Sequence, residues 1–239
     1  TSSTAKAYQM EVEGISTGDK VKDVRPRGTI TGNAQRIADA TLTVAVKSTG
    51  TADTAVKNSK NINLLRFEGR AGEAKDVLFT KAIFASGSGS LNNGQNYTLW
   101  ADTDSDGKVD TILEKGVPHP SSKVTCNQLT GGGFVIPKEK TVVFEVHADI
   151  ASTLTGDDLR LAFSTADSDY IQAEQVDRGS NLTGIKTNST CNNGSNCDII
   201  VTTTTSINYL LVSQGNLYVS KDTTPLRNRQ LLGGSLGDS

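Results

Sequence analysis

Apolar and polar residues alternate along most of this chain with a period of two, the pattern of β-strands that bury one face. The alternation is clearest at 42–47 (LTVAVK) and 141–150 (TVVFEVHADI). Clusters of Gly, Ser, Asn and Asp separate such segments, as they do in β-sandwiches. The pattern predicts strands at 8–13, 42–47, 62–67, 76–84, 97–100, 109–113, 134–136, 141–150, 158–163, 198–201 and 216–219.

Composition agrees with an all-β fold. The 239 residues include 23 glycines, only 5% are aromatic and 35% are hydrophobic. This suits a thin β-sandwich with many turns, and it argues against a dense helical core. The net charge of −2 gives no electrostatic footprint for nucleic acid, and no apolar run approaches the ~20 residues of a membrane span.

The segment 102–110 (DTDSDGKVD) carries the strongest chemical signal. Aspartates stand at positions one, three and five, a glycine suited to a sharp turn stands at six, and an oxygen donor stands at nine, as calcium loops require. Carboxylates this close repel one another unless a cation neutralises them. The candidate calcium ligands are Asp102, Asp104, Asp106, Lys108 and Asp110.

The flanks of this loop distinguish it from an EF-hand. An EF-hand has helices on both sides and a bidentate Glu at position twelve. Here both flanks read as strands, position twelve is Leu113, and Glu114 follows it. The bidentate ligand is missing, shifted or supplied by Asp110. The pattern favours a calcium loop at the tip of a β-hairpin, and an acidic, solvated turn without a metal is the alternative.

Two of the three cysteines are placed for a disulfide, which would imply an oxidising, extracytoplasmic setting. Cys191 and Cys197 bracket the flexible polar loop NNGSN, which a local disulfide can close. A zinc site is the alternative, but no second pair and no nearby histidine supports it. Cys126 remains, and we expect a buried, inert thiol.

Short internal similarities suggest a repeat. Residues 3–11 resemble 164–174, and 37–44 resemble 212–219. We therefore expect one module at 41–215, the tail strands of a preceding repeat at 1–40, and the first strands of a following one at 216–239. Without an initiator Met, the chain reads as a mature or excised piece. Its terminal strands would need covalent tandem neighbours or other copies of the chain to cover them, as in strand complementation.

Four phrases resemble the Ig-like tandem modules of large prokaryotic surface proteins, namely S-layer, adhesin and fibre proteins. They are ATLTV at 40–44, LLRF at 64–67 followed by GEAKDV at 72–77, VIPKEKTVVFEV at 135–146, and LTGDDLRL at 154–161. Glu139 or Lys140 stands where many relatives carry Gly. The resemblance implies an Ig-like antiparallel β-sandwich, secretion, tandem arrangement and no catalysis.

Together these features predict a non-catalytic structural module, extracellular or at the cell surface. It would be a building block of a fibre, S-layer or adhesin stalk, assembled head to tail and rigidified by calcium. No common catalytic motif appears, and the adjacent Asp157 and Asp158 would point to opposite faces of a strand. The alternative is a carbohydrate- or ligand-binding module that uses Tyr97 and Trp100. Sequons make Asn96, Asn181, Asn188 and Asn193 candidates for glycosylation.

Overall fold

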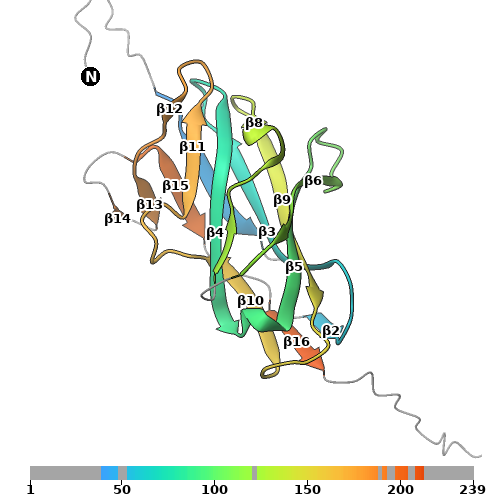
Figure 1. Cartoon of the computed structure of the whole chain (residues 1–239). Coiled ribbons are helices and arrows are strands. Elements are labelled where there is room, and N and C mark those ends of the chain that lie inside the picture. The colour runs from blue at the N-terminus through green and yellow to red at the C-terminus, as the bar shows by residue number, and fades with distance from the viewer. Residues whose placement is uncertain are drawn as a thin grey trace, which may run out of the picture.

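The computed structural model describes residues 39–47, 53–119, 123–187, 190–192, 197–203 and 208–212. Within these ranges two eight-stranded sheets form a β-sandwich (Figure 1). The first sheet has the order β14 (Thr190–Cys191), β13 (Ile185–Thr187), β15 (Ile199–Thr203), β1 (Leu42–Lys47), β3 (Ile62–Ala71), β9 (Thr141–Ile150), β5 (Gly94–Ala101) and β6 (Thr111–Val117).

The second sheet is organised around the 13-residue strand β4 (Val77–Gly89). Its order is β12 (Ser180–Asn181), β11 (Ile171–Gln175), β4, β10 (Asp158–Phe163), β16 (Asn208–Val212) and β2 (Asp53–Val56), and β7 (Lys123–Cys126) and β8 (Phe134–Ile136) also pair with β4. Two 3-10 turns, η1 (Leu91–Asn93) and η3 (Thr130–Gly132), complete the described elements. None of these elements is a helix long and apolar enough to cross a membrane.

The predicted all-β sandwich is confirmed, with one departure from a purely antiparallel arrangement. Most neighbouring strands are antiparallel, but β15 runs parallel to both β1 and β13, and β16 runs parallel to β2. The reason lies in the path of the chain. Near its start the chain passes from β1 in the first sheet to β2 in the second, and near its end it passes from β15 to β16 in the same order. β15 therefore lies parallel to β1, and β16 lies parallel to β2.

The core between the sheets is built from alternating apolar side chains and a phenylalanine cluster. Phe67 on β3 stacks on Phe144 of β9 at a centroid distance of 5.0 Å. Phe163, from β10 of the other sheet, meets Phe67 edge-on at 5.2 Å. Aromatic pairs of this kind contribute about 0.5–1.5 kcal/mol each beyond their buried area. All six phenylalanines of the chain make such ring contacts, and they are Phe67, Phe79, Phe84, Phe134, Phe144 and Phe163.

The start of β5 is fixed by a buried side chain, which matters because β5 leads into the acidic loop. The Asn93 Oδ1 accepts a hydrogen bond from the Thr155 N–H at 2.6 Å, and its Nδ2 donates to the carbonyls of Thr155 and Asp158, each at 3.0 Å. Four residues further on, the Tyr97 hydroxyl donates to the Leu91 carbonyl at 2.8 Å. Burial raises the pKa of Tyr97 well above its usual value. The start of β5 is therefore held by side-chain hydrogen bonds from Asn93 and Tyr97.

Several strand predictions are correct to the residue, for segments of very different length. The strands expected at 134–136, 141–150 and 158–163 begin and end as predicted. The strand expected at 109–113 begins instead at Thr111 and continues to Val117. The described strands fall within the module expected at 41–215, whereas the strands expected at 8–13 and 216–219 lie outside the described residues, so the repeat boundaries stay predictions.

Candidate metal site at the β5–β6 hairpin

The acidic loop lies where the sequence placed it, at the tip of an antiparallel hairpin. Trp100 pairs with Ile112 and Ala101 with Thr111, so residues 102–110 connect β5 to β6. β6 is the edge strand of the first sheet, and β5 is held by β9 on its other side. The Asp102 N–H donates to the Val143 carbonyl at 2.9 Å, which ties the first residue of the loop to β9.

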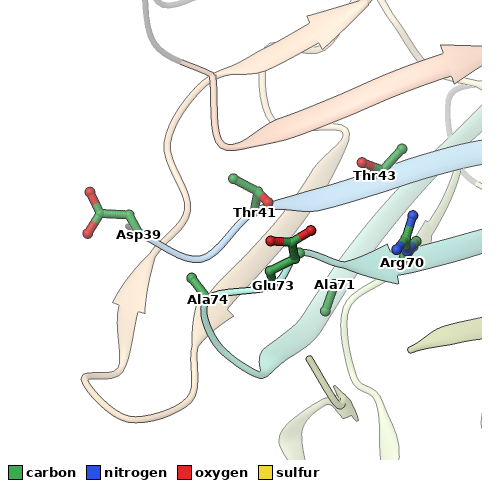
Figure 2. Close-up of a pocket in the computed structure, with 8 residues that line it drawn as sticks. Asp39, Thr41, Thr43, Arg70, Ala71, Glu73 and Ala74 are labelled. Carbon is green, nitrogen blue, oxygen red and sulfur yellow. The ribbon is translucent and has the colours of Figure 1, made fainter. Parts of the chain in front are cut away.

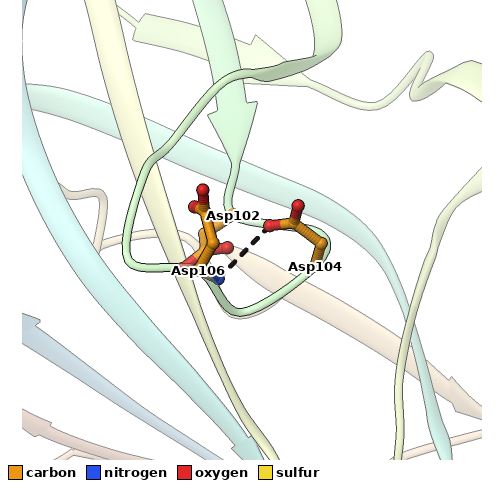
Figure 3. A group of neighbouring side chains, drawn as sticks. All are labelled: Asp102, Asp104 and Asp106. Carbon is orange, nitrogen blue, oxygen red and sulfur yellow. Dashed lines mark hydrogen bonds between the residues drawn. The ribbon is translucent and has the colours of Figure 1, made fainter.

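Three carboxylates converge inside this loop (Figure 3). Asp102, Asp104 and Asp106 each offer an oxygen within 4.8 Å of those of the other two. Main-chain N–H groups hold them in place. The Asp106 N–H donates to Asp104 Oδ1 at 3.2 Å, and the Gly107 N–H donates to Asp102 Oδ2 at 3.1 Å. The sharp turn is made by Ser105 and Gly107, whose φ angles of 63° and 88° lie in the left-handed region.

Asp102 differs from its two neighbours because it is buried. Only 5% of its surface is exposed, whereas Asp104 and Asp106 are exposed. Its Oδ1 is shielded from solvent and has no hydrogen-bond partner. A buried carboxylate oxygen without a partner is costly, and two further carboxylates nearby raise the cost. A cation among the three side chains would remove both penalties.

The other predicted ligands are placed less favourably. Asp110 is not part of the three-carboxylate group, and its Oδ1 accepts a hydrogen bond from Thr111 Oγ1 at 3.2 Å. The ammonium group of Lys108 lies 3.6 Å from Asp106 Oδ2, on a side chain that is 80% exposed.

Position twelve of the loop supplies no ligand. Leu113 is 4% exposed and belongs to the core. The Glu114 side chain is directed elsewhere, because its Oε2 accepts the Gln128 N–H at 3.0 Å. The bidentate glutamate of an EF-hand therefore has no counterpart at residue 113 or 114.

The donor set fits a hard cation. All three converging groups are carboxylates, the ligands that calcium and magnesium prefer, and the cluster includes neither histidine nor cysteine. The loop therefore offers chemistry for holding a divalent ion.

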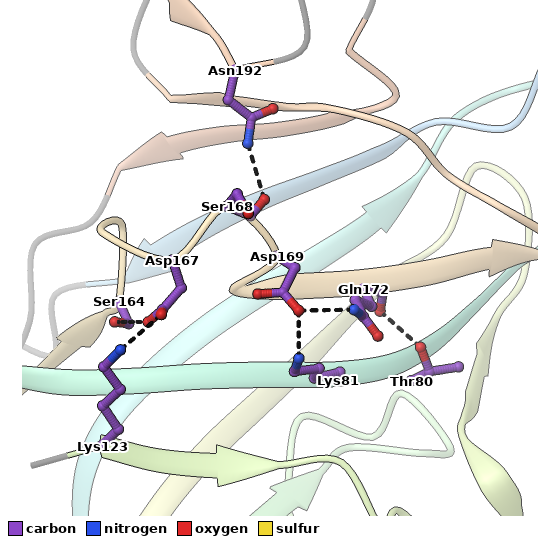
Figure 4. Close-up of polar contacts among 9 residues, drawn as sticks. All are labelled: Thr80, Lys81, Lys123, Ser164, Asp167, Ser168, Asp169, Gln172 and Asn192. Atoms are coloured by element: carbon purple, nitrogen blue, oxygen red, sulfur yellow. Dashed lines mark hydrogen bonds and ion pairs between the residues drawn. The ribbon is translucent and has the colours of Figure 1, made fainter. Parts of the chain in front are cut away.

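Sequence reasoning missed a second acidic loop, which connects β10 to β11. Its carboxylates meet lysines from neighbouring strands (Figure 4). Lys123 on β7 lies 2.7 Å from Asp167 Oδ1, and Lys81 on β4 lies 2.7 Å from Asp169 Oδ2. The hydrogen bond from Lys123, with a smaller contribution from Ser164, lowers the pKa of Asp167 below its usual value. Because these partners lie 44 and 88 residues apart along the chain, no local signal could have revealed them.

The predicted disulfide is present. Cys191 and Cys197 are bonded, with their Cα atoms 5.9 Å apart, so these two sulfurs are not free for the zinc alternative. The bond joins β14 to the residues that precede β15. Cys126 is buried as expected, and burial, with the nearby charge of Glu114, raises the pKa of its thiol.

Two of the four candidate glycosylation sites lie in the described part of the chain. Asn96 is exposed, but the amide nitrogen that would carry a glycan donates to Asp149 Oδ2 at 3.0 Å. Asn181 is exposed in the short strand β12. Asn188 and Asn193 lie outside the described residues.

The two rings named for ligand binding do not form a shared surface. Tyr97 is fully buried in the core. Trp100 is half-buried, and its indole stacks on the His147 ring at a centroid distance of 5.4 Å. One face of the indole is therefore already in use, and the platform of several exposed rings that sugars prefer does not arise from this pair.

A hollow of about 350 Å³ lies at the start of β1 and the end of β3 (Figure 2). Arg70 lines it together with the carboxylates of Asp39 and Glu73. The hollow is open, and its lining carries both signs of charge, so it selects neither an anionic nor a cationic ligand.

Comparisons with known proteins leave the family open. No family model and no curated protein matches the chain. Among solved structures, it is similar to the seventh ScaB type I cohesin from Pseudobacteroides cellulosolvens, with 7% identity over 75% of this chain and 97% of that one and a TM-score of 0.34. It is also similar to AvmM, described as catalysing macrocyclization in alchivemycin A biosynthesis, with 8% identity over 75% and 92% of the two chains and a TM-score of 0.30. Likeness of this degree carries no argument about function, and the assignment as a β-sandwich rests on the two sheets of the chain itself.

Proposed function

We propose that this chain is a calcium-binding structural module of an extracellular or cell-surface protein. The single observation that carries the proposal is the buried Asp102, whose Oδ1 has no partner and which lies among two further carboxylates. In the proposed site Asp102, Asp104 and Asp106 hold the ion, and Lys108, through its main-chain carbonyl, and Asp110 remain candidates for further positions.

The proposed role of the ion is mechanical. Asp102 is anchored to β9 through its N–H group, whereas the rest of the loop extends beyond the sheet. An ion shared by the three carboxylates would couple the exposed tip to this anchor and stiffen the edge hairpin. The disulfide supports an oxidising compartment. A dissociation constant of about 10⁻⁴ to 10⁻³ M, typical of extracellular calcium modules, would match such a setting.

The wider role that we propose is that of a building block in a fibre, S-layer or adhesin stalk, with no catalytic activity. The proposed lack of catalysis has support in the second acidic loop, where Asp167 and Asp169 are already paired with Lys123 and Lys81. Strand complementation through the terminal segments would join neighbouring modules or copies. A carbohydrate platform has weaker support, since Tyr97 is buried and His147 covers one face of Trp100.

Calcium titration of the full chain tests the metal proposal. Isothermal titration calorimetry should give one site, removed by Asp104→Asn and Asp106→Asn together. Limited proteolysis should cut near Gly107 faster in a chelator than in calcium, because the ion would restrain the loop. Sodium chloride at equal ionic strength is the control, because a monovalent salt screens charge without supplying a divalent ion. Absence of calcium binding at millimolar concentration, with cleavage rates equal in chelator and calcium, would overturn the proposal.

Electron microscopy of the purified full chain tests the proposed assembly. Filaments or sheets with a regular axial repeat would support a building block, and their loss in chelator would place the hairpin at the joint. Dispersed single particles in both conditions would contradict assembly of this chain alone.

A further inference from the structure

We infer that His147 is a proton-operated latch: when it binds a proton from water, it ties the turn between β2 and β3 to the outer face of the first sheet. This turn, residues 57–61, carries the chain from the second sheet to the first. The inference is independent of the proposed calcium site, and a proton is the only ligand that it requires.

The first step is the position of the imidazole. His147 projects from the face of β9 opposite to its buried neighbours Val146 and Ala148. Its side chain is only 11% exposed, and so is that of Glu145, two residues earlier on the same face. Trp100 of β5 stacks on the ring at a centroid distance of 5.4 Å. The ring is thus largely shielded from water, and its nitrogens depend on protein partners.

The second step is what the two ring nitrogens face. Nε2 lies 2.8 Å from Glu145 Oε2, and Nδ1 lies 3.0 Å from Oδ1 of Asn61, the last residue of the turn. Neither an ionised carboxylate nor an amide oxygen can donate a hydrogen. A neutral imidazole has a single N–H group, so it serves one of these acceptors, and the carboxylate is the stronger. In the neutral form the Nδ1 lone pair therefore faces the Asn61 oxygen with no hydrogen between them.

The third step is the proton, which resolves this conflict by binding at Nδ1. Both nitrogens of His147 then donate, and the imidazolium charge lies beside the Glu145 carboxylate and over the indole of Trp100, which attracts cations. The new hydrogen bond from Nδ1 to Asn61 joins the turn to β9. This contact is present while His147 is protonated and is lost as the pH rises through the titration of the ring, which for histidine falls between about pH 5 and 8.

Charged groups around the ring come from β9 and from the β3 side. β9 supplies Glu145 and Asp149. The cations are Arg66, 3.2 Å from Glu145 Oε1, and Lys60, 3.0 Å from Asp149 Oδ2. Residues 94–101 of β5 contain no Asp, Glu, Lys, Arg or His, and their one tyrosine is buried in the core. Each cation is thus paired with one carboxylate, and the Glu145 carboxylate is the charged group within hydrogen-bonding distance of the ring.

Trp100 gives a direct optical test, because it is the single tryptophan of the chain and the chain has only two histidines, His119 and His147. An imidazolium quenches the fluorescence of an indole on which it stacks. In chelator, where ions at 102–110 do not contribute, Trp100 emission should fall as the pH is lowered from about 8 to about 5. His147→Gln should abolish this change, and His119→Gln should keep it. Emission that does not change with pH in the wild type, or a change that survives in His147→Gln, would overturn the inference.

Asn61→Gly tests the latch itself. Asn61 has a φ of 54°, in the left-handed region that glycine adopts without strain, so the variant can keep the turn while it loses the side-chain amide. The midpoint of the fluorescence titration should fall by about 0.5 to 1 in pH, because the imidazolium loses an acceptor of ordinary hydrogen-bond strength. Glu145→Gln is the positive control, and it should lower the midpoint whichever way the Asn61 amide points.

The sign of the shift in Asn61→Gly decides between the two orientations of the amide. A midpoint that rises would mean that Asn61 presents its N–H group to a neutral ring. An unchanged midpoint would mean that the turn does not respond to the proton. Either result would overturn the inference, and neither would bear on calcium binding at the hairpin.

Discussion

The two acidic loops of this molecule solve the same electrostatic problem in different ways. In the β10–β11 loop, Lys123 and Lys81 reach across from β7 and β4 and place an ammonium group 2.7 Å from Asp167 and Asp169. In the β5–β6 loop the ammonium group of Lys108 lies farther away, 3.6 Å from Asp106 Oδ2, on a highly exposed side chain. Asp102 is buried there without a partner for its Oδ1.

The presence or absence of lysine partners distinguishes an acidic cluster that is neutralised by the protein from one that would gain stability from a bound metal. Carboxylates that meet protein cations are part of the folded structure at low cost. Carboxylates that converge without a cation, one of them buried, are an incomplete arrangement in water. Density of aspartates in the sequence does not distinguish the two cases, because the lysines come from distant strands.

The largest expected effect is a calcium response confined to the hairpin. At a calcium concentration about 100 times the dissociation constant, the wild type should gain about 2.7 kcal/mol in free energy of unfolding. The Asp104→Asn/Asp106→Asn double variant should lose this gain. The matched double variant, Asp167→Asn/Asp169→Asn, should keep it, because lysines rather than a metal neutralise that loop. Urea unfolding with and without calcium measures both, and a calcium response lost in the second variant would refute the distinction.

The next largest effect concerns Asp102→Asn, whose effect on the free energy of unfolding should change sign between chelator and calcium. In chelator, Asp102→Asn should stabilise the chain by about 1 kcal/mol, because it removes a buried charge next to Asp104 and Asp106 and leaves an amide oxygen for the Gly107 N–H. In excess calcium the same variant should be less stable than the wild type, because it has lost a ligand.

Asp167→Asn is the matched control, because its effect on stability should have the same sign in chelator and in calcium. It should destabilise the chain in both conditions, because it leaves Lys123 without its carboxylate. Thermal unfolding of the two variants with and without calcium makes the comparison. Destabilisation by Asp102→Asn in chelator would mean that the buried carboxylate is already compensated.

Acid should weaken the lysine-neutralised loop, with a smaller effect. The hydrogen bond from Lys123 lowers the pKa of Asp167, so this group contributes stability that is present above the unfolded pKa of about 3.9 and is lost as the pH falls through the lower, folded-state pKa. Lys123→Gln should make stability less dependent on pH in that window. Urea midpoints measured from about pH 5 down to about pH 3 test this, and an unchanged slope would show that Lys123 does not set the pKa.

Local pattern was enough for the long strands and for the position of the acidic loop. Strands such as 141–150 alternate over ten residues, and their boundaries were predicted correctly. The hairpin followed from two strand-like flanks around a turn-forming glycine. The disulfide followed from two cysteines that bracket a short polar loop.

What the sequence could not supply depends on contacts between distant segments. β7 and β11 were not predicted, because their buried positions include weakly apolar residues such as Cys126 and Ala173, and both strands depend on pairing with β4. The parallel pairing of β15 with β1 joins segments at opposite ends of the described chain. Likewise, the loop pattern predicted Asp110 as a ligand together with the other aspartates. Only the folded structure shows that the converging carboxylates are those of Asp102, Asp104 and Asp106.

The smallest effect concerns Lys108, the one cation among residues 102–110. Its ammonium group would compete weakly with calcium for Asp106, because an exposed pair at 3.6 Å is largely screened by water and salt. Lys108→Gln should therefore tighten calcium binding only about twofold, equivalent to about 0.4 kcal/mol, and the difference should vanish at high salt. Calorimetric titration at low and high salt measures it, with Lys115→Gln on the neighbouring strand β6 as a control of equal charge. A tightening of tenfold or more would mean that Lys108 neutralises the cluster as Lys123 neutralises its own, and the contrast between the two loops would be one of degree.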